Sequence, residues 1–290
     1  MKQARQRRDG ATEAGWPPVT GERLVEDLRR LGVEPGQTLL VNASLSSIGW
    51  VDGGAPAVVA ALREAVGPAG NVVTPTGTEE NSNFSRAHQA AVAGMTWDEL
   101  KAYRRRMPAF DKHATPTTMG MIAEALRTSD GAVRSDHPQS SFSAVGPDAA
   151  ELMADHQLEC HLGERSPLAK LYQRDARVLM IGVGFGYCTA LHLAEYRYLP
   201  KPPMQTYTCV AIIGGERQWT AYADVVLDDN DFDEIGKSLA DNVPVREDTV
   251  GRAAGRLMPV RGVVDFAVEW MSKHRRVDPD QMQVGDLCKL

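Results

Sequence analysis

His192 and Glu195 are the two residues of this chain whose types and spacing point most directly to chemistry. They lie in the segment 177–200, RVLMIGVGFGYCTALHLAEYRYLP. Its apolar residues 178–183 predict a buried strand, and we expect a helix to follow, with Thr189 as its N-cap. His192 then lies in the first helical turn, on the same face as Glu195. Partial positive charge at a helix N-terminus favours the neutral imidazole, and a neutral histidine held by a carboxylate is a good general base.

A purely structural role is the alternative for this pair, with His192 packing or capping and Glu195 solvated. Pairs spaced His-x-x-Glu are common, so the motif needs a supporting context. That context has to come from the elements that position the pair.

The loop at residues 43–54, ASLSSIGWVDGG, is a possible anion-binding segment. It follows a predicted strand at 37–42 and precedes a predicted helix at 56–66. Backbone N–H groups in such a loop and at a helix N-terminus can bind phosphate oxygens. No Gly-Lys-Ser/Thr follows, which disfavours a nucleotide triphosphatase. An ordinary tight connection is the alternative.

Three other groupings are incomplete as motifs. The glycines of 182–186 are spaced G-x-G-x-G and lack the acidic residue of a dinucleotide site. The histidines and cysteine of 156–161 lack a second pair of ligands, so we expect no metal site. Ser140 and Ser141 follow a histidine but are not part of a G-x-S-x-G nucleophile elbow.

Several carboxylates occupy predicted loops, where they could line a cleft for a polyamine. Glu79 and Glu80 follow a predicted strand at 71–74, Asp111 lies in the turn-rich PAFDKHATP, and Asp228 begins an acidic run before a helix. The alternative for each is a capping or solvated loop residue.

Composition limits the class of protein. The chain has 290 residues, a formal net charge of −6 and 43% hydrophobic residues, enough for one large core. The acidic balance disfavours nucleic-acid binding, and no run of about 18 apolar residues predicts a membrane span. Four irregularly spaced cysteines and the lack of a secretory signal favour a reduced, cytoplasmic setting.

The order of elements predicts the α/β class. Strand, loop, helix and strand follow one another within the first 76 residues, which indicates an α/β unit with function at its strand ends. We expect one compact α/β/α-type unit at 16–276, with a central mixed sheet, helices on both faces and a small lid or insertion at 77–108. Residues 1–15 and 277–290 are expected to be tails. Further helices are predicted at 22–31, 117–127, 147–156, 166–172, 232–239 and 261–273, and further strands at 137–145, 207–213 and 218–225.

Six segments in order give these elements a common context. They are VNASLSSIGWVDGG at 41–54, VVTPT at 72–76, PAFDKHATPTTMG at 108–120, RSDHPQSSFSAVG at 134–146, GERSPLAKLY at 163–172 and TALHLAEY at 189–196. Together they resemble the aminoglycoside 3-N-acetyltransferase family, over about residues 19–266. The resemblance implies an antibiotic-resistance enzyme that transfers acetyl from acetyl-coenzyme A to the 3-amino group of a 2-deoxystreptamine aminoglycoside.

The resemblance also implies roles for individual residues. His192 matches the general base, paired with Glu195, and Thr76 would lie near the thioester and its oxyanion. Transfer would be direct, in a ternary complex, without metal. The positions matching the coenzyme A segments are Ser44, Leu45, Ser46, Gly49, Val51 and Ser166. The candidates for holding the cationic sugar are Asp111, Glu79, Glu80 and Asp228.

Two departures from the family pattern leave alternatives open. Asn42 stands where the family often has histidine, and the segment 77–88 differs from the usual continuation. Acetylation of another amine, such as a biosynthetic intermediate, is therefore a second hypothesis. Coenzyme A binding without catalysis is a third, and a hydrolase that uses Ser140 or Ser141 is a fourth. The chain could also form a homodimer, and we expect no nucleic-acid or membrane partner.

Overall fold

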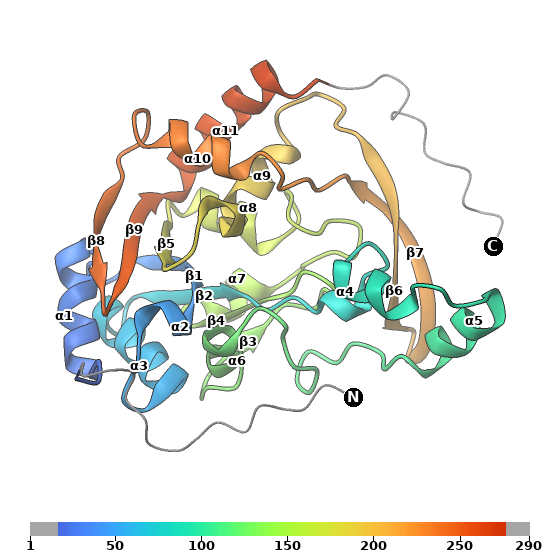
Figure 1. Ribbon diagram of the computed structural model, residues 1–290, viewed down its shortest axis with the longest axis horizontal. Helices are drawn as coiled ribbons and strands as arrows, with labels where there is room; N and C mark the ends of the chain where they lie inside the picture. Colours follow the sequence, from blue (N-terminus) through green and yellow to red (C-terminus); the bar gives the residue numbers. More distant parts are fainter. Residues whose placement is uncertain (1–16, 277–290) are drawn as a thin grey trace.

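A mixed β-sheet forms the centre of the molecule (Figure 1). The computed structural model describes residues 17–276, and within them seven strands make up this sheet. The strands β2, β1 and β5 run parallel to one another, and the outer strands are antiparallel to their neighbours. Across the sheet the order is β3 (Val133–Arg134), β4 (Phe142–Val145), β2 (Asn71–Pro75), β1 (Thr38–Ala43), β5 (Arg177–Ile181), β9 (Ala253–Pro259) and β8 (Arg246–Val250).

Alternating side chains bury both faces of this sheet. Leu39 and Leu179 belong to one apolar cluster, whereas Leu40 and Met180 belong to the other. Successive residues of a strand point to opposite faces, so each apolar strand contributes to two cores. The predicted α/β class, with a mixed sheet and helices on both faces, is confirmed.

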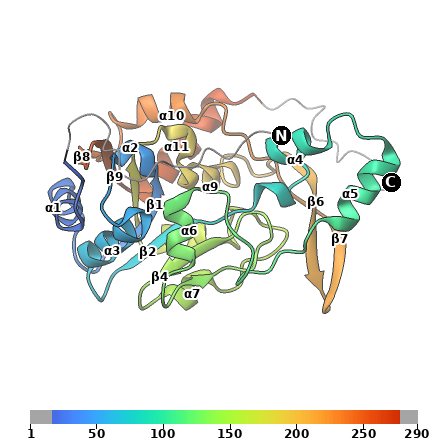
Figure 2. The same cartoon turned by 60° about the horizontal axis from the view of Figure 1, so that its bottom comes forward.

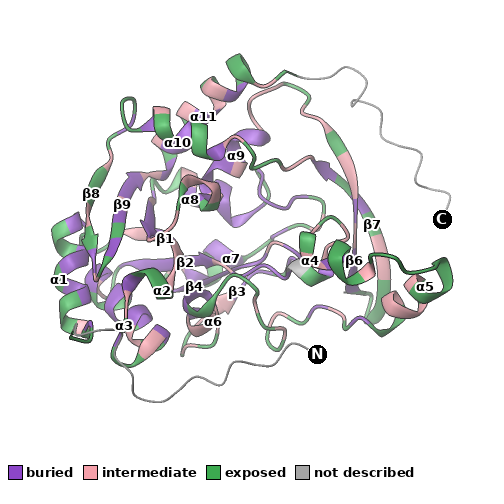
Figure 3. Ribbon diagram, in the orientation of Figure 1, coloured by how far each residue is buried: buried purple, intermediate pink, exposed green. Residues whose placement is uncertain are grey.

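Helices cover the two faces of the sheet (Figure 1), and Figure 3 shows the buried residues of helices and strands in purple. On one side lie α1 (Gly21–Leu31), α3 (Gly54–Val66) and α6 (Met121–Arg127). On the other lie α7 (Ala149–Met153), α8 (Pro167–Gln173), α9 (His192–Glu195), α10 (Phe232–Leu239) and α11 (Val260–His274). Within residues 17–276 no helix combines the length and apolar character that crossing a membrane requires.

A two-stranded hairpin stands apart from the sheet. It consists of β6 (Met204–Ile213) and β7 (Glu216–Val225), which pair along their whole length on either side of Gly214 and Gly215, as predicted. The segment predicted as a lid or insertion, 77–108, lies beside this hairpin (Figure 2). It carries η1 (Glu79–Asn81), α4 (Arg86–Val92) and α5 (Trp97–Arg106).

Hydrogen bonds from side chains connect this segment to the hairpin. Asn81 donates to the Val210 carbonyl over 2.9 Å and accepts from the Val210 amide over 2.8 Å, so its side chain imitates a strand neighbour of β6. Arg217 of β7 donates to the carbonyl of Met107 behind α5. The end of the helix and the edge of the hairpin thereby satisfy each other's polar groups.

Some elements differ from the predictions. The strand predicted at 137–145 is β4 alone, because 137–141 forms a loop in which His137 Nδ1 accepts from the amides of Gln139 and Ser140. The helix predicted at 117–127 begins at Met121. The strands β8 and β9 were not predicted. Both predicted tails lie outside the described residues.

Gly182 fixes the turn that follows β5, and its substitution is a test of this packing. Its φ is +67°, and a Cβ would lie 2.3 Å from Ser47 Cβ and 3.1 Å from Ala253 Cβ. We expect Gly182→Ala to lower the free energy of unfolding by about 3 kcal/mol, from backbone strain plus overpacking. Gly214 has a φ of +60° with nothing within 4 Å, so Gly214→Ala should cost only about 1 kcal/mol. Urea unfolding measures both, and equal losses would contradict the packing argument.

Candidate active site

A cavity of about 400 Å³ opens at the carboxyl ends of β1 and β2. Parallel strands present their carboxyl ends at one edge of a sheet, which is where α/β proteins bind ligands. The segments that follow β5 close the opposite side of the cavity. The lining residues are Val41, Asn42, Ala43, Thr74, Pro75, Thr118, Met119, Ile122, Ala123, Val183, Gly186, Tyr187, Thr189, His192 and Asp229.

His192 forms one wall of this cavity and is hydrogen-bonded to Glu195. The distance from His192 Nδ1 to Glu195 Oε2 is 2.7 Å, and the two side chains are 19% and 0% exposed. A carboxylate can only accept, so Nδ1 carries the hydrogen and Nε2 is the nitrogen left for a ligand. The predicted pairing is thus present in the structure.

The local helix differs from the prediction. Thr189 is not an N-cap, because it begins the 3₁₀ turn η3 (Thr189–Leu191), which leads into the four-residue α9. Its hydroxyl accepts from Asn42 Nδ2 over 2.9 Å instead. So short a helix offers little macrodipole, and the carboxylate is the group that holds the imidazole.

Three groups hold the buried carboxylate of Glu195. Oε2 bonds to His192, while Oε1 accepts from the backbone N–H of Asp228 and from Arg275 Nη1, each over 2.8 Å. Arg275 follows α11 and is 80 residues away along the chain. A buried carboxylate needs such partners, because an isolated charge is costly in a poorly hydrated interior.

Arg275 is itself held by Asp231. Its Nε and Nη2 donate to the two oxygens of Asp231 over 2.7 Å and 2.6 Å, and Nη2 also donates to the carbonyl of Asp228. Burial opposes the charge of this guanidinium, but the hydrogen bonds to Asp231 and the charge of Glu195 outweigh that effect and raise the pKa of Arg275. The guanidinium therefore remains a cation between two carboxylates.

Thr76 was predicted to lie near the thioester, and its hydroxyl is fully buried between β2 and β4. It lies 3.0 Å from Ser143 Oγ and 3.3 Å from the carbonyl of Ser141. Thr189, three residues before His192 in the chain, is one of the hydroxyl residues that line the cavity. Because the Thr189 hydroxyl accepts from Asn42, its own hydrogen remains available to a ligand.

Asn42 also lines the cavity. Its Oδ1 is buried and has no hydrogen-bond partner among the described residues. A buried acceptor without a donor is costly to the folded state.

The loop predicted for coenzyme A lies directly after β1 and folds into α2 (Leu45–Ile48). Ser44 is the N-cap of α2 and accepts from the Ser47 amide. Gly49 has a φ of +98°, and Val51 is buried against Val19. The loop adjoins the cavity through Ala43.

The other predicted coenzyme A positions have structural partners as well. Leu45 packs against one of the apolar clusters, whereas Ser46 is exposed beside Ser44. Ser166 is the buried N-cap of α8, and its Oγ donates to the Gly163 carbonyl over 2.7 Å. A role in coenzyme A binding stays a prediction for all of these residues.

The predicted acidic residues are not gathered around the cavity. Asp111 caps its own turn by accepting from the amides of His113 and Ala114, and the bond to His113 is the main reason that its pKa is lowered. Glu80 is exposed, and the side chain of Glu79 lies outside the described part of the structure.

Two carboxylates of the acidic run have different positions. The Asp228 side chain accepts from Asn230 and is exposed, while its backbone N–H holds Glu195. Its neighbour Asp229 lines the cavity. Within residues 17–276 Asp229 is thus the carboxylate at the cavity wall, which the sequence could not distinguish from Asp228.

Three buried histidines form a separate network. His137 Nδ1 already accepts from two amides and from Ser140 Oγ, and burial lowers the pKa of His137 well below its ordinary value. His161 bonds to Asp224 over 2.7 Å, and burial lowers the pKa of His156 to about 4. Burial disfavours the imidazolium that His137 would have to form on taking the Ser140 proton, and Ser141 is buried on Thr76. Within the described part of the chain, no group of three or more His, Cys, Asp or Glu is arranged to hold a metal.

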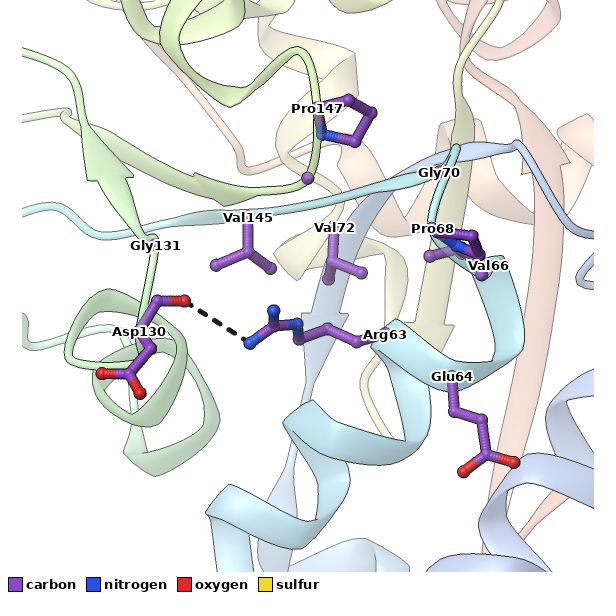
Figure 4. A pocket seen from close by; sticks show the side chains of 12 residues that line it. Arg63, Glu64, Val66, Pro68, Gly70, Val72, Asp130, Gly131, Val145 and Pro147 are labelled. Carbon is purple, nitrogen blue, oxygen red and sulfur yellow. Dashed lines mark hydrogen bonds between the residues drawn. The ribbon is translucent and has the colours of Figure 1, made fainter.

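A larger cavity of about 590 Å³ lies at the opposite ends of β2 and β4 (Figure 4). Arg63 extends along it toward the carbonyl of Asp130, and Val72 and Val145 form its apolar floor. It contains none of the residues predicted to act in catalysis or binding, so its size does not make it the active site.

Comparison with known proteins shows which family this chain resembles in sequence and fold. The family described as aminoglycoside 3-N-acetyltransferase matches residues 40–272. The chain is 39% identical over 255 residues to the SPbeta prophage-derived aminoglycoside N(3')-acetyltransferase-like protein YokD of Bacillus subtilis, covering 87% of this chain and 92% of that protein. The crystal structure of YokD superposes with a TM-score of 0.86, covering 92% of this chain and 98% of that one.

Two further solved structures are similar and contain ligands. AAC-VIa bound to sisomicin is 32% identical with a TM-score of 0.75, covering 88% of this chain and 98% of that one. The binary complex of AAC-IIIb with CoASH is 28% identical with a TM-score of 0.75, covering 88% and 96%. The match of sequence and fold over most of the chain leads to one conclusion: this protein belongs to the aminoglycoside 3-N-acetyltransferase family.

Proposed function

We propose that this protein transfers an acetyl group from acetyl-coenzyme A to the 3-amino group of a 2-deoxystreptamine aminoglycoside, and thereby confers resistance. The observation that carries the proposal is the 2.7 Å bond between His192 and the buried Glu195, at the wall of a strand-end cavity. The family supports it, as do relatives whose structures contain sisomicin or CoASH.

His192 acts as the general base in this proposal. The acceptor amine must be neutral to attack, and His192 Nε2 takes up its proton while Glu195 stabilises the resulting imidazolium. The amine nitrogen forms a bond to the thioester carbonyl carbon, and the carbon–sulfur bond then breaks. The departing thiolate receives the proton from the imidazolium, so no proton is lost or gained overall.

A hydroxyl at the cavity wall stabilises the tetrahedral oxyanion. Thr189 lines the cavity and has a hydrogen free to donate, whereas the Thr76 hydroxyl is already bonded to neighbouring strand groups. We therefore assign this role to Thr189 in place of Thr76.

The two substrates enter from different sides. Ser44, with its neighbours Leu45 and Ser46, offers hydroxyl and backbone groups to coenzyme A just after β1. Asp229 offers a negative charge to the cationic sugar. Both substrates must be present together, because the cysteines that the structure describes are buried and none serves as an acyl carrier.

A different amine acceptor is the second candidate. The segment 77–88, where the sequence departs from the family pattern, is fastened to β6 through Asn81. The relative with 39% identity is named as aminoglycoside N(3')-acetyltransferase-like. If the protein acts on another amine, the His192 chemistry is the same and only the acceptor changes.

The first measurement is thiol release from acetyl-coenzyme A in the presence of a panel of aminoglycosides and simpler polyamines. We expect fast release with a 2-deoxystreptamine aminoglycoside and a product acetylated on the 3-amine, identified by mass spectrometry and NMR. A higher kcat/KM for a non-aminoglycoside amine would favour the second candidate. Background release with every amine, from folded protein that binds coenzyme A, would contradict both.

His192→Ala should lower kcat by about 100-fold or more, because general-base assistance is lost. Coenzyme A affinity should change little, since Nε2 faces the acceptor in this proposal. Glu195→Gln should also lower kcat, because a neutral amide cannot stabilise the imidazolium. His113→Ala, at an exposed histidine outside the cavity, is the matched control. Near-normal turnover in His192→Ala would refute the assignment.

A pair of variants decides which hydroxyl stabilises the oxyanion. Thr189→Val should lower kcat by about 100-fold with little change in KM. Thr76→Val should lower the midpoint of thermal unfolding, because it leaves buried polar partners unpaired, and it should have the smaller effect on kcat. The reverse order of the kcat effects would return the role to Thr76.

A further inference from the structure

We propose that Arg275 is a positioning residue for catalysis: it holds the Glu195 carboxylate in one orientation and keeps it charged, and Glu195 in turn sets the His192 ring. The inference rests on the proposed function, since it concerns the base of that reaction. Arg275 does not line the cavity around His192, so it acts only through Glu195.

The contacts form one continuous chain from Asp231 to the imidazole. Asp231 fixes the guanidinium through two hydrogen bonds, of 2.6 Å and 2.7 Å. The guanidinium donates to Glu195 Oε1 over 2.8 Å, and Glu195 Oε2 accepts from His192 over 2.7 Å. Each side chain has its polar atoms aimed at the next, so rotation of any one breaks a bond elsewhere.

Burial makes the cation necessary. The Glu195 side chain has no exposed surface, and that of Arg275 is 14% exposed. A carboxylate in such a place keeps its charge only if a cation or several donors compensate for the lost hydration. The Asp228 amide supplies one donor, and Arg275 supplies the only full positive charge among the partners of Glu195 in residues 17–276.

Asp231, Arg275 and Glu195 are here called the clamp, and the first two also border a surface outside the active-site cavity. A third cavity, of about 600 Å³, is lined by Asp228, Asp231 and Arg275 together with the exposed Arg276. The Arg275 guanidinium carbon lies 5.8 Å from the centroid of the Tyr198 ring. A change at Arg276 therefore alters this outer surface without touching Glu195.

The position of Arg275 in the chain is informative. The family match ends at residue 272, so the arginine lies three residues beyond it. It is placed by α11, which packs against α9 and brings the end of the described chain to the active site. The protein thus uses a residue outside the matched segment to complete its base.

Removing this cation has a defined consequence for the pH dependence of turnover. A buried carboxyl group without its cation holds a proton more tightly, so the active form requires a higher pH. The acid limb of the kcat profile should therefore move to higher pH in Arg275→Gln. The other titratable groups around the pair are Asp228, Asp229, Asp231, Tyr198 and Tyr207, and all of them remain in this variant.

The test is a double-mutant cycle with Arg275→Gln, Glu195→Gln and the double variant. Arg275→Gln alone should lower kcat by about 10- to 100-fold, with little change in the KM of either substrate. In the Glu195→Gln background the same change should have almost no further effect, because no carboxylate remains to be held. The double variant also lacks an unpaired buried charge, so it tests the proposal even if Arg275→Gln folds poorly.

Two variants serve as matched controls. Arg276→Gln removes the same charge one residue away and should leave kcat and the pH profile unchanged. Arg275→Lys keeps the positive charge but cannot donate to Asp231 and Glu195 with the planar geometry of a guanidinium. The acid limb of its kcat–pH profile should therefore lie at the wild-type pH, whereas its kcat should lie between those of Arg275→Gln and the wild type.

A readout independent of turnover is the NMR titration of the His192 ring, identified by the loss of its signals in His192→Ala. Its midpoint should shift in Arg275→Gln and not in Arg276→Gln. If the wild-type protein acetylates no amine, the proposed function fails, and this titration still decides whether Arg275 controls the His192–Glu195 pair.

Equal multiplicative losses of kcat in both backgrounds would overturn the proposal, because they would show that Arg275 acts independently of Glu195. An unchanged His192 titration in folded Arg275→Gln would overturn it as well. A loss in Arg276→Gln as large as that in Arg275→Gln would assign the effect to the outer surface and exclude a specific clamp.

Discussion

A carboxylate with no exposed surface is the constraint on which the rest of this site depends. Arg275, the Asp228 amide and His192 replace the hydration that Glu195 loses on burial. These partners come from three separate parts of the chain. The short helix α9, the loop after β7 and the end of α11 must therefore meet at one point, and the apolar packing of α9 and α11 against the sheet is what brings them there.

The sheet supplies the other half of the site. Because β1, β2 and β5 are parallel, their carboxyl ends open on one side and the segments that follow them surround a single cavity. Asn42 and Thr189 meet at this edge, from β1 and from the turn after β5. Polar groups line this cavity together with strand-end and α6 residues such as Pro75 and Ile122, a suitable lining for a proposed thioester beside a cationic amine.

Local sequence patterns predicted caps, turns and helix bounds correctly where these depend on neighbouring residues. The helix α1 has its predicted cap at Thr20, the hairpin turns at Gly214 and Gly215, and α10 has the predicted bounds. The pairing of His192 with Glu195 was predictable for the same reason, since residues three apart in a helical turn are neighbours. Short elements were less predictable: β4 and η3 are set by buried hydrogen bonds to distant groups rather than by periodicity.

The sequence by itself determined the α/β class, the family and the pair of residues at the centre of the site, because caps, periodicity and ordered motifs are local properties. Only the tertiary structure decided which groups surround that pair. Arg275 is 80 residues from Glu195 and Asn42 is 147 from Thr189, and no spacing links them. It also separated Asp229 at the cavity from Asp228 behind it, and buried the hydroxyl of Thr76. Burial and partnership arise when distant segments pack together, so they cannot be read from neighbouring residues.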